Sequence, residues 1–378
     1  MRDIDFDVIY IDPPYNTGNS FSYDDKRENA KWREFMRERL TPARNILAKS
    51  GVMFISIDDS QLYPLKLLCD EIFGAQNFLG TFVTKQATRS NAKFINITHE
   101  YILTFAKDKK STLNFRIRRI DDPKYRAIIV KLMREIKNEF GKNGAKSTEK
   151  LLTKRIREIG WSWLENYNLI DENGEIFFAK DLSVPGEPNV LAIPEINLKL
   201  AKLKTRRWSS PQKFTRLAQE NLLSFKNGRP YEKAFLKDSV DNVGSVLDFY
   251  SRMGTNDLNK LGLRDLFDTP KPVELIKYLI RIATNGKSDA KILDFFAGSG
   301  TTGQAVYEIN REDNQDFKFH LVQLNEPISP KSKAYVFAKA NNLIPTVDQL
   351  MLKRLQIVRE KYDIRDELKI GKVDDETI

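Results

Sequence analysis

The feature that most constrains the fold is a glycine-rich segment between a predicted strand and a predicted helix. Residues 291–296 form a short, mostly apolar run, and Gly298, Gly300 and Gly303 follow it with the spacing G-x-G-x-x-G. Glycines at such a junction let the backbone turn tightly and approach a ligand, and the N-terminus of the following helix favours negative charge. Taken alone, the segment fits a dinucleotide site or merely a tight turn between strand and helix.

Three neighbouring features favour S-adenosylmethionine as the ligand of this loop. Asp294 ends the strand, where its carboxylate would lie near the cofactor's amino group and would repel a pyrophosphate. Phe295 and Phe296 offer ring faces to adenine or to the sulfonium cation. Glu326 follows the next predicted strand, 319–324, where a ribose hydroxyl needs an acceptor. A nicotinamide-dependent dehydrogenase uses much the same loop, but it leaves the two features described next unexplained.

The first of these is a proline corner at the end of an apolar strand. Residues 8–11 are β-branched or aromatic, and Asp12, Pro13, Pro14 and Tyr15 follow. Two consecutive prolines fix φ, remove two amide donors and keep the preceding residues extended. The corner therefore presents an acid, a carbonyl and an aromatic ring at the carboxyl end of a strand, where open α/β sheets bind ligands.

These groups suit attack by the exocyclic amine of a nucleobase, which is a poor nucleophile because its lone pair is delocalised into the ring. The Asp12 carboxylate and the Pro13 carbonyl can accept its two hydrogens, and Tyr15 offers a face to a base turned out of the duplex. The alternative is a strand exit stiffened by prolines, with a surface aspartate.

The second feature is the distribution of charge. The net charge is +10, yet residues 107–237 alone contain 29 Lys and Arg against 16 Asp and Glu, a net of +13. The rest of the chain, with 33 against 36, is slightly acidic. Such a basic segment is typical of a nucleic-acid contact, although Lys-rich solvated helices have the same composition. Within it, Arg206, Arg207 and Trp208 combine guanidinium groups with an indole, a mixture suited to phosphate and base contacts.

Buried strands alternate with helices on both sides of this basic segment. Strands are expected at 52–57, 78–83 and 100–105, and helices at 32–48 (with a break at Pro42), 58–73, 269–284, 330–342 and 346–361. The alternation predicts a parallel-rich, doubly wound α/β sheet. Residues 108–235 are irregular, with helical stretches near 124–140 and 147–160, and read as an inserted α+β domain. The polar loop 85–96 is expected to lie over the site.

Other chemistries find little support in the composition. Cys69 is the only cysteine and fits a buried helix position, and with only His99 and His320 besides, no cluster has metal-ligand spacing. No apolar run reaches membrane-spanning length, and no signal peptide is visible. A reducing cytoplasm fits this composition.

The motifs together resemble a known family. DPPYNTG, HEYILTFAK, a basic insert, DTPKP and ILDFFAGSGTTGQAV recur in this order in β-class amino-group DNA methyltransferases, and the chain looks most like the modification subunit of type III restriction–modification systems. The resemblance covers most of 6–107 and 262–360. It implies a Rossmann-like core and site-specific methyl transfer from S-adenosylmethionine to adenine N6 in duplex DNA. It also implies a homodimer and a restriction subunit as partner.

The resemblance also implies roles for residues and segments. Asp12, Pro13, Pro14 and Tyr15 would be catalytic, and the insert would take the place of the target-recognition domain. The cofactor would be surrounded by Lys271, Pro272, Asp294, Phe295, Phe296, Ala297, Gly298, Ser299, Gly300 and Glu326. The expected segments are a catalytic half (1–107), the insert (108–240), a cofactor-binding half (241–345), and a C-terminal helix with a tail (346–378).

The chain departs from the family at both ends. Members usually have a strand, a helix and a Gly-Asp-Asn stretch before DPPY, and further strand after the last helix. A strand starting at Phe6 is therefore expected to border an uncovered sheet edge, which favours self-association and weak activity of the isolated chain. Two alternatives stay open: an inactive DNA-binding or assembly subunit, and methylation of cytosine N4.

Overall fold

The computed structural model describes residues 5–17, 28–86, 93–264 and 266–371. It divides the chain into two compact units, one formed by residues 1–117 with 242–378 and the other by 118–241. Every helix of the described residues is too short or too polar to cross a membrane. The expected loop 85–96 lies partly outside the described residues.

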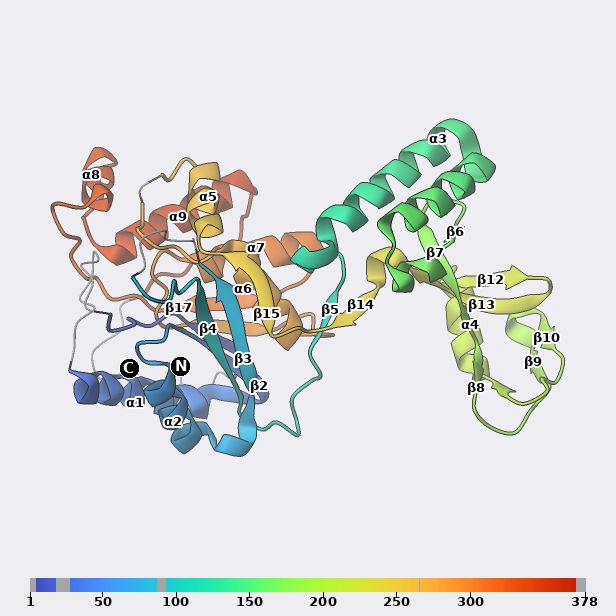
Figure 1. Cartoon of the computed structure of the whole chain (residues 1–378), viewed down its shortest axis with the longest axis horizontal. Coiled ribbons are helices and arrows are strands. Elements are labelled where there is room, and N and C mark those ends of the chain that lie inside the picture. The colour runs from blue at the N-terminus through green and yellow to red at the C-terminus, as the bar shows by residue number, and fades with distance from the viewer. Residues whose placement is uncertain (1–4, 18–27, 87–92, 265, 372–378) are drawn as a thin grey trace. The chain divides into compact units, whose positions relative to one another are not determined.

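The first unit is built on a seven-stranded sheet with the order β15-β3-β4-β2-β1-β16-β17 (Figure 1). Its strands are β1 (Phe6–Ile11), β2 (Leu47–Ile57), β3 (Phe78–Lys85), β4 (His99–Ala106), β15 (Val246–Tyr250), β16 (Lys291–Asp294) and β17 (Lys318–Leu321). Only β4 runs antiparallel to its neighbours, and the other pairings within this sheet are parallel. The doubly wound, mostly parallel sheet predicted from the sequence is confirmed.

Helices cover both faces of this sheet because its strands are apolar on both sides. Val8 and Tyr10 of β1 pack with the helices α6 and α7, whereas Ile9 and Ile11 pack with α1 and α2. Figure 1 shows α1 and α2 together along one side of the sheet. The helices of this unit are α1 (Asn29–Ile46), α2 (Leu62–Phe73), α5 (Arg252–Lys260), α6 (Val273–Ala283), α7 (Thr301–Asp313), α8 (Lys333–Ala340) and α9 (Val347–Lys361), with a 3₁₀ turn η1 (Ala75–Asn77).

The position of β1 corrects one expectation. Val8 pairs with Val52 of β2 on one side and with Ile292 of β16 on the other. β1 is therefore an interior strand, and the expectation that it borders an uncovered edge is wrong. The sequence order misled because β16, which comes much later in the chain, pairs with β1 on the side opposite to β2.

The second unit contains a long kinked helix and several small antiparallel sheets. The helix α3 (Pro123–Ile159) changes direction at Gly144, whose φ of 71° is not helical. Its other elements are η2 (Ser162–Asn166), β6 (Leu169–Ile170), β7 (Ile176–Asp181), β8 (Ser183–Val184), β9 (Leu191–Ile193), η3 (Pro194–Ile196), β10 (Leu198–Leu200), β11 (Arg207–Trp208), α4 (Pro211–Gln219), β12 (Leu223–Lys226), β13 (Arg229–Phe235) and η4 (Leu236–Asp238). The chain enters and leaves this unit through β5 (Arg116–Arg118) and β14 (Val240–Asn242).

Candidate active site

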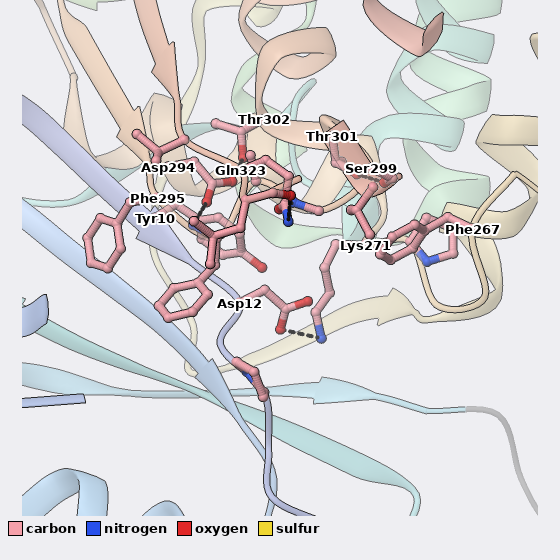
Figure 2. Close-up of a pocket in the computed structure, with 18 of the residues that line it drawn as sticks. Tyr10, Asp12, Phe267, Lys271, Asp294, Phe295, Ser299, Thr301, Thr302 and Gln323 are labelled. Atoms are coloured by element: carbon pink, nitrogen blue, oxygen red, sulfur yellow. Dashed lines mark hydrogen bonds and ion pairs between the residues drawn. The ribbon is translucent and has the colours of Figure 1, made fainter. Parts of the chain in front are cut away.

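A cavity of about 290 Å³ lies at the carboxyl ends of β1 and β16, within the first unit (Figure 2). Most of its lining residues come from four segments: the corner after β1, the segment before α6, the glycine loop after β16 and the segment after β17. Phe35 and Arg39 of α1 and Val347 of α9 complete it. Among the lining residues are Tyr10, Asp12, Pro14, Lys271, Asp294, Phe295, Phe296, Ala297, Gly298, Ser299 and Glu326. The proline corner and the glycine loop, which are nearly 300 residues apart in the sequence, thus share one cavity.

Helix α1 contacts the proline corner through a hydrogen bond to its backbone. The indole of Trp32, which is fully buried, donates a 2.8 Å hydrogen bond to the Pro14 carbonyl. Pro13 is buried, and its carbonyl accepts no hydrogen bond from the described part of the chain. Asn16 has a φ of 60°, which turns the chain directly after Tyr15. The corner is therefore rigid on one side, and the Pro13 carbonyl has acceptor capacity left.

The Oδ1 atom of Asp12 makes an ion pair with the Lys271 ammonium but accepts no hydrogen bond of good geometry from the described residues. This oxygen is buried. Burial raises the pKa of Asp12 above its ordinary value, the positive charge of Lys271 opposes that shift, and the negative charge of Glu100 adds to it. A buried carboxylate oxygen that has an ion-pair partner but no hydrogen bond can still accept a hydrogen bond from a ligand.

Lys271 lies at this corner and not only beside the glycine loop. Its Nζ is 2.6 Å from the Tyr15 hydroxyl, 2.7 Å from Glu100 Oε2 and 3.2 Å from Asp12 Oδ1. Figure 2 shows the ion pair with Asp12. Burial acts to lower the pKa of Lys271, but the carboxylates of Asp12 and Glu100 outweigh it and raise the pKa above its ordinary value. The ammonium therefore stays charged.

Asp294 lies on the opposite wall of the cavity. Its Oδ2 accepts a 2.6 Å hydrogen bond from the Thr302 hydroxyl and its Oδ1 a 3.0 Å bond from the Phe296 amide. Burial nevertheless raises the pKa of Asp294 to about 7, and nearby Asp12 adds to that shift. A carboxylate poised in this way gains from a cationic ligand, whereas a pyrophosphate would be repelled by it.

The amides of the glycine loop bear on the choice between a dinucleotide and another ligand. Gly298 N–H donates to Gln323 Oε1 at 2.7 Å, Gly300 N–H to the Ala297 carbonyl at 2.8 Å, and Ala297 N–H to the Val322 carbonyl. Phosphate-binding loops need such amides free. Three of these amides are already used, which argues against a dinucleotide and fits a ligand held by the acidic and aromatic side chains.

Gly300 does not line the cavity. Its φ is +77°, and a Cβ there would lie 2.9 Å from Met351 Cγ of α9. Pro272 also lies outside the lining residues and precedes α6 as its N-cap. Eight of the ten residues predicted to surround the cofactor therefore line the cavity, whereas Gly300 and Pro272 lie in the segments next to it.

Arg354 of α9 braces the glycine loop. This fully buried side chain donates to the Ser299 and Thr301 hydroxyls, each at 2.8 Å, and to Gln304 Oε1 at 2.9 Å. Burial lowers the pKa of Arg354 to about 10. Helix α9, which was predicted from the sequence as part of a separate segment 346–378, lies in the first unit and contacts its glycine loop.

The three residues proposed for DNA contact lie in the second unit and differ in exposure. Arg206 and Arg207 are exposed, although Arg206 also donates to the Ser183 hydroxyl at 2.8 Å. Trp208 is only 5% exposed, and its indole donates to the Ala201 carbonyl. The burial argues against stacking of Trp208 on a base, because its ring already fills a small core with Phe214.

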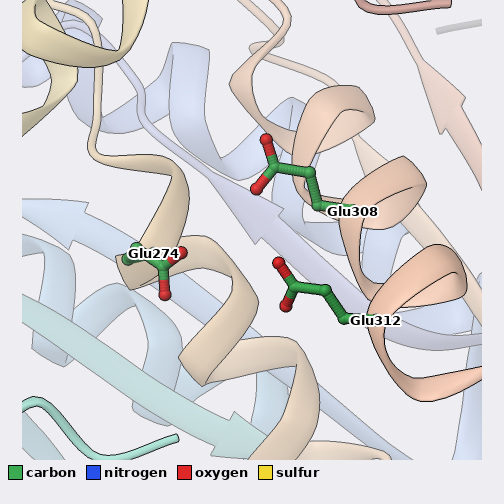
Figure 3. A group of neighbouring side chains, drawn as sticks. All are labelled: Glu274, Glu308 and Glu312. Carbon is green, nitrogen blue, oxygen red and sulfur yellow. The ribbon is translucent and has the colours of Figure 1, made fainter. Parts of the chain in front are cut away.

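Glu274, Glu308 and Glu312 form an acidic group between α6 and α7 (Figure 3). The fully buried ammonium of Lys277 lies 2.8, 3.2 and 2.7 Å from these three carboxylates. It occupies the place that a cation would take. The group is therefore an ion-pair network that joins two helices.

Three residues that line the cavity or contact the corner were not singled out from the sequence. Glu100, Tyr10 and Gln323 contact the corner or the loop. Each lies in a strand or directly after one, and its sequence context is that of an ordinary strand residue. The signal that was available for Glu100 is an acid at the start of an otherwise apolar strand, in HEYILTFA.

The fold and cavity define a class of protein: an α/β enzyme with an acidic and aromatic cofactor pocket beside a D-P-P-Y corner, as in amino-group methyltransferases. A family model for DNA methylases matches residues 6–336. The chain belongs to this DNA methylase family.

Two curated relatives illustrate the match. The type III restriction–modification enzyme EcoP15I Mod subunit of Escherichia coli is 31% identical over 86% of this chain and 56% of its own length. The type II methyltransferase M.KpnI of Klebsiella pneumoniae is also 31% identical, over 94% of this chain and 83% of its own. The chain spans little more than half the length of the type III subunits it matches.

Among solved structures, the PvuII DNA methyltransferase, described as cytosine-N4-specific, aligns with a TM-score of 0.38 and 12% identity, covering 94% of this chain and 88% of its own. A likeness this remote places no individual residue.

Proposed function

We propose that the chain is a site-specific DNA methyltransferase that transfers a methyl group from S-adenosylmethionine to N6 of adenine in duplex DNA, within a restriction–modification system. One observation carries this proposal: Asp12 Oδ1, a buried oxygen that is ion-paired with Lys271 but accepts no hydrogen bond from the described residues, lies in the same cavity as Asp294 and the glycine loop. An amine presented there supplies that hydrogen bond.

The residues around the cavity fit the proposed cofactor. The acidic Asp294 and the rings of Phe295 and Phe296 suit its positive charge and its adenine, and Glu326 offers an acceptor for ribose. When bound, S-adenosylmethionine supplies an electrophilic methyl group on a sulfonium. Arg354 and Thr302 hold the loop in place through Ser299 and Asp294.

The corner acts on the nucleophile. Asp12 Oδ1 and the Pro13 carbonyl accept hydrogen bonds from the two N–H groups of the amine, which draws its nitrogen towards sp³ and frees its lone pair. The Asp12 carboxylate would take the one proton that the nitrogen loses when it gains the methyl group. Tyr15 provides the ring face for the flipped base. The attack is direct, so no covalent intermediate forms on the protein and Cys69, which is buried, has no part in it.

DNA, a second copy of the chain and a restriction subunit are the partners we propose. The names of the type III relatives support a place beside a restriction subunit. The unit 118–241 contains 25 Lys and Arg against 17 Asp and Glu, a net of +8, which supports a role in DNA recognition.

Nucleoside mass spectrometry tests the proposal. The protein is incubated with labelled S-adenosylmethionine and with DNA amplified in vitro, which carries no methylated bases. Labelled N6-methyladenine supports the proposal, and labelled N4-methylcytosine would assign the other amino group. DNA binding without label in either base would mean a non-catalytic DNA-binding subunit.

A further inference from the structure

Glu100, at the start of β4, contacts two members of the catalytic corner. Its Oε2 accepts hydrogen bonds from Lys271 Nζ at 2.7 Å and from the Tyr15 hydroxyl at 3.3 Å. Its Oε1 accepts a hydrogen bond from the side-chain amide of Gln86. Both carboxylate oxygens are therefore engaged, and the side chain is only 15% exposed.

One ammonium thus faces two carboxylates. Lys271 Nζ makes a hydrogen bond to Glu100 at 2.7 Å, whereas it approaches Asp12 Oδ1 to 3.2 Å without hydrogen-bond geometry. Glu100 and the Tyr15 hydroxyl accept hydrogen bonds from two of the three N–H groups of the ammonium. Asp12 Oδ1 is left next to a positive charge, yet its acceptor capacity is not used by any described residue.

We propose that Glu100 is a positioning residue that holds the Lys271 ammonium off Asp12 Oδ1, and so keeps that oxygen open to the amino group of the target base. The inference rests on the proposed function. It adds a residue from a different strand to the catalytic corner, and it gives Lys271 a role at the corner as well as beside the cofactor.

The consequence of losing Glu100 follows from the charges. Lys271 is shielded from solvent, with 14% of its side chain exposed, and it keeps its charge. Without the Glu100 carboxylate, the nearest anion is Asp12, so the ammonium moves onto Oδ1 and competes with the target amine. Tyr15 loses an acceptor for its hydroxyl in the same step.

Loss of the Glu100 carboxylate should also change the pKa of Asp12. The groups that act on Asp12 or are acted on by it are Lys271, Glu100, Tyr15, Tyr10 and Asp294. The negative charge of Glu100 raises the pKa of Asp12, and the positive charge of Lys271 lowers it. Glu100→Gln removes the negative charge that raises the pKa of Asp12 and brings the Lys271 ammonium closer to Asp12. Both changes lower the pKa of Asp12.

Single-turnover methyl transfer, measured between about pH 5 and about pH 9, tests the inference because the acidic limb reports an essential base. In Glu100→Gln the plateau rate should fall about 10-fold, the lower end of what loss of an outer-shell partner costs at metal sites. The acidic limb should move to lower pH. Glu274→Gln, which breaks another lysine–glutamate pair, is the matched control and should leave both unchanged. An unchanged rate, or a lower rate with an unmoved limb, would overturn the inference.

A second measurement does not depend on turnover. Carbon NMR of protein labelled at the aspartate carboxyl carbons follows the titration of Asp12, assigned with Asp12→Asn. We expect a lower pKa of Asp12 in Glu100→Gln than in the wild type. If that shift occurs in a protein that transfers no methyl group, the proposed function has failed, but the competition of Glu100 and Asp12 for the Lys271 ammonium is supported. If the pKa does not shift, the inference fails whether or not the protein is active.

Discussion

The carboxylate of Asp294 accepts a 2.6 Å hydrogen bond from Thr302, and this contact joins the end of β16 to the first turn of α7 across the glycine loop. Two hydrogen bonds support the ionised form, yet burial is the stronger influence and the pKa of Asp294 is about 7. The carboxylate is thus sensitive to any cation that enters the cavity.

This sensitivity predicts a pH-dependent affinity for S-adenosylmethionine. The folded-state pKa lies above the ordinary value of 3.8, so the folded chain holds this proton more tightly than the unfolded chain. Its contribution to stability therefore declines as pH rises from about 4 to about 7. A cationic ligand favours the ionised carboxylate, so affinity should rise through about pH 7 and then level off.

Calorimetric titration with S-adenosylmethionine on either side of pH 7 measures this effect. Asp294→Asn should bind more weakly at high pH and lose the pH dependence around 7. Asp12→Asn should keep a pH dependence, shifted to lower pH, because the charge of Asp12 raises the pKa of Asp294. An equal pH dependence in wild type and Asp294→Asn would show that another group is responsible.

Gly300→Ala should destabilise the protein more than Gly298→Ala. Both glycines have positive φ, which costs an alanine roughly 1–2 kcal/mol. At Gly300 the new Cβ would also lie 2.9 Å from Met351 Cγ, while at Gly298 the nearest atom is 3.5 Å away. Crowding of this kind costs about 1–3 kcal/mol more. Thermal unfolding of the two variants is the comparison, and equal melting temperatures would mean that α9 gives way freely.

Removing Arg206 and Arg207 together should weaken the salt dependence of DNA binding. If each exposed guanidinium neutralises one phosphate, the slope of log K against log salt falls by about 0.9 per residue. Binding isotherms on one duplex at several salt concentrations give the slope. Lys339→Ala, in the first unit, is the control. A slope unchanged in the double variant would identify the pair as solvated surface.

Trp208→Ala should act on stability and not on base recognition. The ring is buried against Phe214, and its indole nitrogen is satisfied by the Ala201 carbonyl. Its removal should cost about 3–5 kcal/mol, whereas Arg207→Ala next to it should change little. Hydrogen exchange of residues 118–241 reports the difference. Normal protection in Trp208→Ala with weakened DNA binding would restore a contact role.

Periodicity and turn residues were enough to predict the central strands, because β1, β2, β4 and β16 are apolar runs with polar ends. The sequence did not show that α1 continues through Pro42. This helix tolerates the missing amide because Trp32, Met36, Leu40 and Ala43 are buried along one side. Strand β15 was missed since its exposed and buried residues alternate over only five positions at the sheet edge.

Residues of the cavity could be predicted where they stand next to a recognisable turn in the sequence. Residues that reach the site from distant elements could not. Asp12 and Asp294 each end a strand next to an unusual turn, which is visible in the sequence. Glu100 and Arg354 reach the site from elements far along the chain, and only the three-dimensional arrangement reveals their partners. The burial of Trp208 is likewise not visible in the sequence, because a tryptophan that follows two arginines has the same sequence pattern whether it is exposed or buried.

The most direct test of the account is methyl transfer by Asp12→Ala under single-turnover conditions, with nucleoside mass spectrometry as readout. Loss of one positioned electrostatic group should lower the rate at least about 10²-fold, with DNA affinity and cofactor affinity nearly unchanged. The exposed Asp289→Ala should retain full activity. If Asp12→Ala forms N6-methyladenine at nearly the wild-type rate, the D-P-P-Y corner is structural and the proposed chemistry is wrong.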